Sequence, residues 1–182
     1  MTRIINIIGG PGAGKSTLAA GVFYELKMKG YNVELSSEYA KDLVYENRSE
    51  TFKDELYIFA KQAHRLFSLK NKVDIVVTDR PLIMSLVYNE YYNTAPDAKE
   101  WNNAFNNIVR ETWNRYDNIV YVLNRVNEYH HEGRNENEDQ AKELDEMFKK
   151  KLEQYGVNYK LIDGDESGIK TIVDDIANKS SE

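Results

Sequence analysis

The 182-residue chain contains no cysteine, which excludes disulfides, thiolate metal sites and a cysteine nucleophile. It has no run of eighteen apolar residues, the length that a membrane-spanning helix needs. Its first residues lack the basic segment, apolar core and cleavage site of a signal peptide. An excess of positive charge is also missing, since 24 Lys and Arg against 30 Asp and Glu give a net charge of −6. We therefore expect a cytoplasmic protein with no membrane partner, and only a local basic groove could hold nucleic acid.

Proline and glycine are few, at three and ten residues. Four of the glycines and one proline fall within residues 9–14, so backbone freedom is concentrated near the N-terminus. The segment before them, Arg3–Ile8, is rich in β-branched residues and typical of a strand buried on both faces. The segment after them, Lys15–Lys29, repeats apolar residues at helical spacing. The glycine-rich segment is therefore predicted to be a loop between a strand and a helix.

Strands and helices are predicted to alternate five times along the chain. Further strands are predicted at residues 32–36, 74–78, 118–123 and 158–162, and further helices at 37–47, 54–70, 82–91, 97–115, 140–155 and 168–178. This order predicts one α/β domain over residues 1–182, with three layers, α/β/α, around a five-stranded parallel sheet. Residues 124–139 contain few apolar side chains and are predicted to form a mobile lid, and residues 179–182 a frayed tail.

The helix predicted at 54–70 has apolar residues at helical spacing. Such a stripe normally packs against the core, while the remaining face meets solvent. The residues expected to face the core are Leu56, Phe59, Ala60, Ala63, Leu66 and Phe67.

The glycine-rich segment and the two residues after it match the Walker A pattern G-x-x-x-x-G-K-[ST]. Polyphosphate oxygens must be surrounded by backbone N–H groups, which requires a curled loop with few side chains. The following helix adds the positive end of its dipole. Lys15 is expected to reach the β- and γ-phosphates of ATP and to act in catalysis, and the Ser16 hydroxyl is expected to bind Mg²⁺. The predicted nucleotide-binding residues are Gly9, Gly10, Pro11, Gly12, Ala13, Gly14, Lys15, Ser16 and Thr17.

Asp79 directly follows the apolar strand predicted at 74–78. Ligands of open α/β sheets bind along the carboxyl edge, so Asp79 is predicted to hold the Mg²⁺ or to take the proton of the acceptor. Arg80 is suited to bind an anionic acceptor or the transferring phosphoryl group. The alternative is a turn that caps the next helix, with Pro81 at its first position.

Glu38 and Tyr39 follow the second predicted strand, at the same edge of the sheet. They are candidate substrate-binding residues, with the Tyr39 ring placed to stack on a base. Alternatively, Glu38 only stabilises the N-terminus of its own helix through the helix dipole. The sequence leaves both interpretations open.

The predicted lid contains Arg125 and Arg134, which are suited to close over the transferring phosphate and exclude water. The alternative is a solvated loop with incidental charges. His130 and His131 are adjacent, with no third ligand at a fixed spacing, which is a weak metal signal. The loop Asp163–Asp165 is predicted to cap the last helix, at an edge where it could also contact a nucleotide base.

These segments resemble those of P-loop nucleoside and nucleotide kinases over nearly the whole chain. Ser37–Lys41 resembles a Trp-Glu-Tyr-Gly-Arg segment of nicotinamide riboside kinase domains, and Glu128–Arg134 resembles their lid, one residue shorter. Asp79-Arg80-Pro81 resembles the Asp-Arg-Tyr segment of thymidylate kinases, with Pro81 in place of the aromatic residue. Kinases of 5-hydroxymethyluracil in DNA, found in bacteriophages, are also broadly similar.

The resemblance implies the strand order 2-3-1-4-5 and Mg-ATP-dependent phosphoryl transfer to a nucleoside-like or nucleotide-like acceptor. DNA stays open as an alternative substrate, as does a P-loop NTPase with a non-kinase role. A homo-oligomer also stays open.

Overall fold

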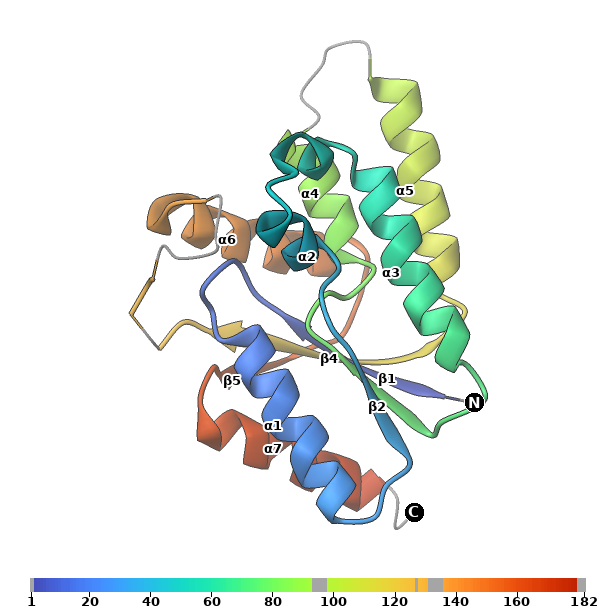
Figure 1. The fold of residues 1–182 in the computed structure, drawn as a ribbon, viewed down its shortest axis with the longest axis vertical. Helices are drawn as coiled ribbons and strands as arrows, with labels where there is room; N and C mark the ends of the chain where they lie inside the picture. The colour runs from blue at the N-terminus through green and yellow to red at the C-terminus, as the bar shows by residue number, and fades with distance from the viewer. Residues whose placement is uncertain (1, 93–97, 127, 131–135, 180–182) are drawn as a thin grey trace.

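A five-stranded, wholly parallel sheet forms the centre of the molecule (Figure 1). The computed structural model describes residues 2–92, 98–126, 128–130 and 136–179. The strand order is β2-β3-β1-β4-β5, which confirms the predicted order. The strands are β1 (Arg3–Ile8), β2 (Val33–Ser36), β3 (Ile75–Thr78), β4 (Asp117–Asn124) and β5 (Lys160–Asp163).

The helices follow the predicted sequence of elements, with ends that differ by a few residues. Their bounds are α1 (Lys15–Met28), α2 (Ala40–Tyr45), the 3-10 helix η1 (Ser49–Lys53), α3 (Glu55–Leu69), α4 (Met84–Tyr92), α5 (Lys99–Trp113), α6 (Glu138–Gln154) and α7 (Glu166–Lys179). The helix predicted at 37–47 is thus shorter, and η1 follows it. In the described ranges, no helix is both long enough and apolar enough to cross a membrane.

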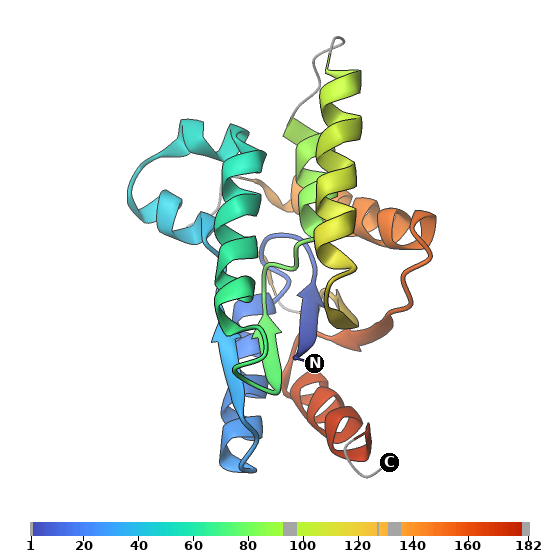
Figure 2. The ribbon, with the colours of Figure 1, turned by 90° about the vertical axis from the view of Figure 1, so that its right-hand side faces the viewer.

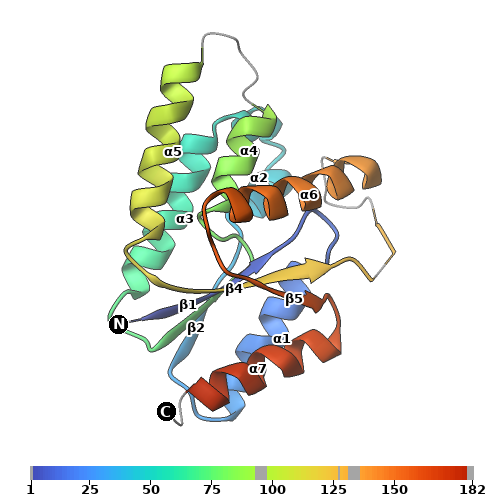
Figure 3. The ribbon, with the colours of Figure 1, turned by 180° about the vertical axis from the view of Figure 1, so that it is seen from behind.

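Alternate side chains of the strands enter two separate cores, one on each face of the sheet. On one face, Ile5 and Ile7 pack against α1 and α7, which lie together below the sheet in Figures 1 and 3. On the other face, Ile4 and Ile8 pack against α3, α4, α5 and α6. This arrangement confirms the three-layer α/β/α architecture.

Side-chain caps fix where two of the helices begin. Asp54 accepts a hydrogen bond from the backbone N–H of Tyr57, 3.1 Å away, at the start of α3. Asn137 and Gln140 form a reciprocal capping box at the start of α6. The second cap sets the start of α6, which lies beside the phosphate loop.

The face of α3 that turns inward differs from the one predicted from its apolar stripe. Leu56 and Phe67 are exposed, by 41% and 68%, whereas Glu55 and Gln62 are buried. Each buried polar side chain has a partner in the core: Glu55 pairs with Arg80, and Gln62 hydrogen-bonds to other side chains. Because paired polar groups can be buried at low cost, these contacts rotate α3 away from its most apolar orientation.

Candidate functional site

The Walker A segment forms a tight loop between β1 and α1. Gly12 and Gly14 have φ angles of 77° and 94°, which only glycine adopts readily. Lys15 begins α1 and is buried, and its ammonium donates a hydrogen bond to the Gly10 carbonyl at 3.0 Å. Ser16 and Thr17 are exposed in the first turn of α1. The loop is therefore curled as phosphate binding requires, with the Ser16 hydroxyl accessible.

Burial lowers the pKa of the Lys15 ammonium below its ordinary value, and the carboxylates of Glu38 and Asp79 oppose that shift. A cation with so little water around it gains strongly from an added negative charge. The phosphates of a nucleotide would supply that charge.

Asp145 of α6 holds the start of the loop, a role that the sequence did not reveal. Its Oδ1 accepts a hydrogen bond from the backbone N–H of Gly10. A Cβ atom at Gly10 would lie 2.4 Å from the Ala141 carbonyl oxygen and 2.9 Å from Asp145 Oδ1, so position 10 has no room for a side chain. The loop is thus supported from α6 as well as from its own strand and helix.

Arg125 lies directly on this loop instead of in an open lid. Its Nη2 forms an ion pair with Asp145 Oδ2 at 2.9 Å, and its Nη1 donates to the Pro11 carbonyl at 2.8 Å. The Tyr129 ring also lies against the loop, since a Cβ atom at Gly12 would come within 2.8 Å of a ring carbon. The carboxylate of Asp145 thus anchors Arg125, the first arginine of the predicted lid.

The predictions for Arg134 and His131 of the lid concern residues that the structure does not describe. Arg134, His131 and the rest of residues 131–135 lie outside the described residues, as do residue 127 and the tail residues 180–182.

Asp79 lies at the carboxyl edge of the sheet, as predicted. Thr78 of β3 is in register with Asn6 of β1, so Asp79 lies beside the strand that leads into the phosphate loop. The Asp79 side chain is buried, and its Oδ1 has no hydrogen-bond partner within the described structure. A buried, unpaired carboxylate oxygen is costly unless a ligand or cation completes it. With the exposed Ser16 hydroxyl, this oxygen fits the ligand set of a nucleotide-bound Mg²⁺.

Arg80 is buried between two carboxylates and an aromatic ring. Its Nη2 lies 2.9 Å from Glu55 Oε1, its Nε lies 3.9 Å from Glu38 Oε1, and its guanidinium carbon lies 3.9 Å from the centroid of the Tyr88 ring. Although burial opposes the shift, the charges of Glu55 and Glu38 hold the pKa of Arg80 above its ordinary value. The Nε and Nη1 donors have no hydrogen-bond partner among the described residues. Arg80 is therefore a fixed cation with donors to spare for an anionic ligand.

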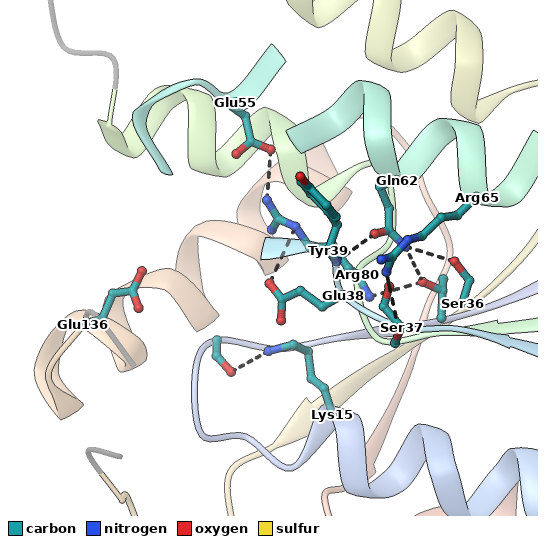
Figure 4. Close-up of polar contacts among 12 residues, drawn as sticks. Lys15, Ser36, Ser37, Glu38, Tyr39, Glu55, Gln62, Arg65, Arg80 and Glu136 are labelled. Atoms are coloured by element: carbon teal, nitrogen blue, oxygen red, sulfur yellow. Dashed lines mark hydrogen bonds and ion pairs between the residues drawn. The ribbon is translucent and has the colours of Figure 1, made fainter. Parts of the chain in front are cut away.

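Glu38 lies between the two cations of the site. Figure 4 shows its carboxylate next to Arg80 and above Lys15. The neighbouring Tyr39 is fixed by contacts on both its backbone and its ring. Its N–H donates to Gln62 Oε1 at 3.2 Å, and its hydroxyl lies 2.8 Å from the Tyr57 hydroxyl. Since α2 begins only at Ala40, Glu38 itself lies outside the helix.

The β5–α7 loop closes the other side of the phosphate loop. A Cβ atom at Gly164 would lie 2.3 Å from the Ala13 carbonyl oxygen, so the two loops are in direct contact. Asp165 Oδ1 accepts a hydrogen bond from the backbone N–H of Ser167 at 2.9 Å. The predicted cap of the last helix is therefore confirmed, and the same loop borders the predicted nucleotide site.

Three residues that shape the site were missed from sequence. Glu55 binds Arg80, and Gln62 accepts a hydrogen bond from the backbone of Tyr39. Asp145 binds the phosphate loop at Gly10. The only signal in the sequence was a charged residue, Glu55, immediately after the predicted start of its helix.

A sequence profile described as an AAA domain matches residues 4–167, which is 164 of the 182 residues. The chain belongs to this AAA domain family. The chain is also 34% identical over 94 residues to a probable thymidylate kinase from Sulfurisphaera tokodaii. The aligned segment covers 48% of this chain and 50% of that protein. The chain thus spans about half the length of the curated relative it matches.

Solved structures with the same fold include nucleoside and nucleotide-binding proteins. A NadR protein in complex with NR has a TM-score of 0.68 at 22% identity, covering 91% of this chain and 46% of that one. A NadR protein in complex with NAD and AMP-PNP has a TM-score of 0.69 at 18% identity, covering 100% of this chain and 50% of that one. A deoxyadenosine kinase from M. mycoides with bound dATP has a TM-score of 0.59 at 22% identity, covering 98% and 100%. These structural similarities confirm the P-loop kinase fold of the chain.

Proposed function

We propose that this chain transfers the γ-phosphoryl group of Mg-ATP to a hydroxyl group of a nucleoside-like or nucleotide-like acceptor. The observation that most directly supports the proposal is a group of four charged side chains at the carboxyl edge of the sheet. Two of them, Lys15 and Arg80, are cations, the other two, Glu38 and Asp79, are carboxylates, and all but Glu38 are buried. Such an arrangement suits the charge that moves during phosphoryl transfer.

The phosphate loop and its lysine would bind the polyphosphate of ATP. Lys15 now donates to the Gly10 carbonyl, 3.0 Å away, and a bound phosphate oxygen would replace that weaker acceptor. Ser16 and Asp79 would hold the Mg²⁺, which neutralises charge on the β- and γ-phosphates when it is bound. In that role Asp79 would use its buried Oδ1, which has no hydrogen-bond partner among the described residues.

The acceptor would lie on the side of the loop where Glu38 and Arg80 meet. Its hydroxyl oxygen attacks the γ-phosphorus, the bond from that phosphorus to the β,γ-bridging oxygen breaks, and ADP leaves. The hydroxyl proton passes to the carboxylate of Glu38 or Asp79. The free Nε and Nη1 donors of Arg80 would bind oxygens of the acceptor or of the transferring group.

The acceptor class is supported by the names of similar proteins. One relative is described as a probable thymidylate kinase, and the solved structures include a deoxyadenosine kinase and a NadR protein bound to NR. All three descriptions involve nucleosides or nucleotides. A Tyr39 ring at the acceptor side is compatible with stacking on a base.

The test is a product assay with the purified chain, ATP and Mg²⁺. Nucleosides, nucleoside monophosphates and DNA containing 5-hydroxymethyluracil are offered separately, and ³¹P NMR detects the new phosphate ester. The proposal expects an ester on at least one nucleoside or monophosphate, lost in Asp79→Asn. Release of inorganic phosphate with no ester on any acceptor would instead support a P-loop NTPase. An ester found only on DNA would support the DNA-base kinase.

A further inference from the structure

A line of side-chain contacts joins Arg80 to the segment just before α6. The guanidinium carbon of Arg80 lies 3.9 Å from the centroid of the Tyr88 ring. The Tyr92 ring, one turn further along α4, is nearly parallel to the Tyr88 ring, with an interplanar angle of 8° and centroids 6.2 Å apart. The Tyr92 hydroxyl donates a hydrogen bond to the carboxylate of Glu136. Two rings of α4 therefore connect Arg80 to a carboxylate from a distant part of the chain.

Glu136 is also held from the side of the phosphate loop. Its carbonyl oxygen accepts a hydrogen bond from the Tyr129 hydroxyl, and a Cβ atom at Gly12 would lie 2.8 Å from a carbon of the Tyr129 ring. Directly after Glu136, the capping box of Asn137 fixes the start of α6. Figure 4 shows Glu136 across the site from Arg80. The contacts of Glu136 thus link the phosphate loop to the ring that lies against Arg80.

The hydroxyl of Tyr92 is suited to act as a donor to this carboxylate. Burial raises the pKa of Tyr92 above its ordinary value, and the hydrogen bond and charge of Glu136 raise the pKa further. The hydroxyl therefore keeps its proton near neutral pH. Hydrogen bonds to carboxylates are stronger than those between neutral groups, so this contact can hold the Tyr92 ring in a defined position.

The packing of α4 on α6 does not depend on this hydrogen bond. Figures 2 and 3 both show α4 next to α6. The Tyr88 ring packs against the Phe148 ring of α6, with centroids 5.6 Å apart, and Lys151 of α6 forms an ion pair with Glu90 of α4. Loss of the Tyr92 hydroxyl would therefore leave the two helices together. The hydrogen bond instead affects how the rings of α4 lie relative to the phosphate loop.

The placement of Arg80 is sensitive to the Tyr88 ring. Among the described residues, the Nη2 of Arg80 donates to Glu55 Oε1 at 2.9 Å, whereas its Nε and Nη1 have no hydrogen-bond partner. A guanidinium bound at one nitrogen can still pivot, and a ring against its face restricts that motion. A misplacement of about 1 Å in a group that binds the reactants can cost about a hundredfold in rate.

We propose that Tyr92 is a positioning residue for phosphoryl transfer. By donating to Glu136 and stacking on Tyr88, it sets the position of the Arg80 guanidinium relative to the phosphate loop. This inference rests on the proposed function, in which Arg80 binds the acceptor or the transferring group. Tyr92 itself touches neither reactant and acts through Tyr88 and Arg80.

The first experiment removes the hydroxyl of Tyr92 and keeps its ring. In Tyr92→Phe, kcat should fall about tenfold, because the hydrogen bond to the carboxylate is lost, while the KM for ATP should change by less than about twofold. Tyr159→Phe is the matched control. The Tyr159 hydroxyl also donates to a carboxylate, Glu153 Oε1 at 3.2 Å, but it lies just before β5, at the opposite edge of the sheet from the site. The control should keep the wild-type kcat.

The second experiment tests whether Tyr92 acts through Glu136. Glu136→Gln keeps a carbonyl oxygen that can accept from Tyr92 and should retain most of the activity, whereas Glu136→Ala should lose as much as Tyr92→Phe. The double variant Tyr92→Phe with Glu136→Ala should lose no more than either single variant, because both remove the same contact. A purely structural role would lower the amount of folded protein, as measured by circular dichroism, without separating kcat from KM.

A wild-type kcat in Tyr92→Phe, or losses that add in the double variant, would overturn the inference and leave the proposed function standing. A wild-type chain that forms inorganic phosphate but no ester would contradict the kinase function alone. The variants would then be compared on phosphate release, in which Arg80 meets the same transferring group. A chain that does not turn over ATP would overturn both.

Discussion

Arg80 and Glu55 meet at 2.9 Å in a contact where each side chain is only 4% exposed. Glu55 neutralises one end of the guanidinium, while Glu38, at 3.9 Å, lies on the side that faces Lys15. The two carboxylates therefore differ in role. Glu55 holds the arginine in place, and Glu38 remains available to an acceptor.

That difference predicts opposite effects of two matched substitutions. Glu55→Gln removes the buried counter-charge of Arg80 and should destabilise the fold by about 3 kcal/mol or more, the scale for breaking a buried pair. Glu38→Gln, at a side chain 23% exposed, should leave stability almost unchanged and lower turnover. Urea unfolding and steady-state kinetics of both variants separate the two effects. A Glu38→Gln variant with full turnover would remove Glu38 from the reaction.

Lys15→Ala should abolish phosphoryl transfer without unfolding the chain. The ammonium has few partners to lose, since its hydrogen bond is to the Gly10 carbonyl of its own loop, and burial already disfavours its charge. Product formation and the thermal midpoint are measured on the same preparation. Turnover comparable to wild type would contradict the assigned role of the loop.

Asp79→Asn should lower turnover roughly a hundredfold or more, the scale of a general base or metal-orienting group. The affinity for ATP should change less, because the loop amides still bind the phosphates. Nucleotide binding by calorimetry, set beside turnover at saturating ATP, distinguishes the two quantities. If turnover were unaltered, Asp79 would return to the role of a helix cap.

Arg134→Ala should reduce turnover more than it weakens ATP binding, because a transition-state contact of an arginine can contribute several kcal/mol. Arg125 already contacts Asp145 and Pro11, so a second arginine is needed to reach the transferring group. Arg115→Ala, an exposed arginine after α5, is the control. Equal kinetics for the Arg134 and Arg115 variants would leave the lid without a catalytic arginine.

Local patterns in the sequence were sufficient to predict the strands of the sheet and the phosphate loop. The β-branched segment Arg3–Ile8 forms β1 with the bounds predicted, and the strand before Asp79 places that residue at the edge of the sheet. Both predictions depend on neighbours along the chain. The chemistry of Lys15 in such a loop is likewise a property of a short segment.

Contacts between distant segments could not be predicted in this way. The inward face of α3 is set by Glu55 and Gln62, whose partners lie up to 26 residues away. The Asp145 carboxylate meets Gly10 across 135 residues of sequence. Periodicity assigns apolar side chains to the core. It therefore predicted the helix at 54–70 but not its buried face, which includes two paired polar residues.

Gly10 stands at a position that the Walker A pattern leaves variable, yet here it faces the Ala141 carbonyl and the Asp145 carboxylate at distances that exclude any side chain. Which residues position 10 can accept therefore depends on α6, more than a hundred residues downstream. In an alignment of homologues, we expect residue 10 and residue 145 to covary, with larger residues at 10 accompanied by loss of the aspartate. Grafting this loop into another P-loop scaffold would then require both positions to be transferred together.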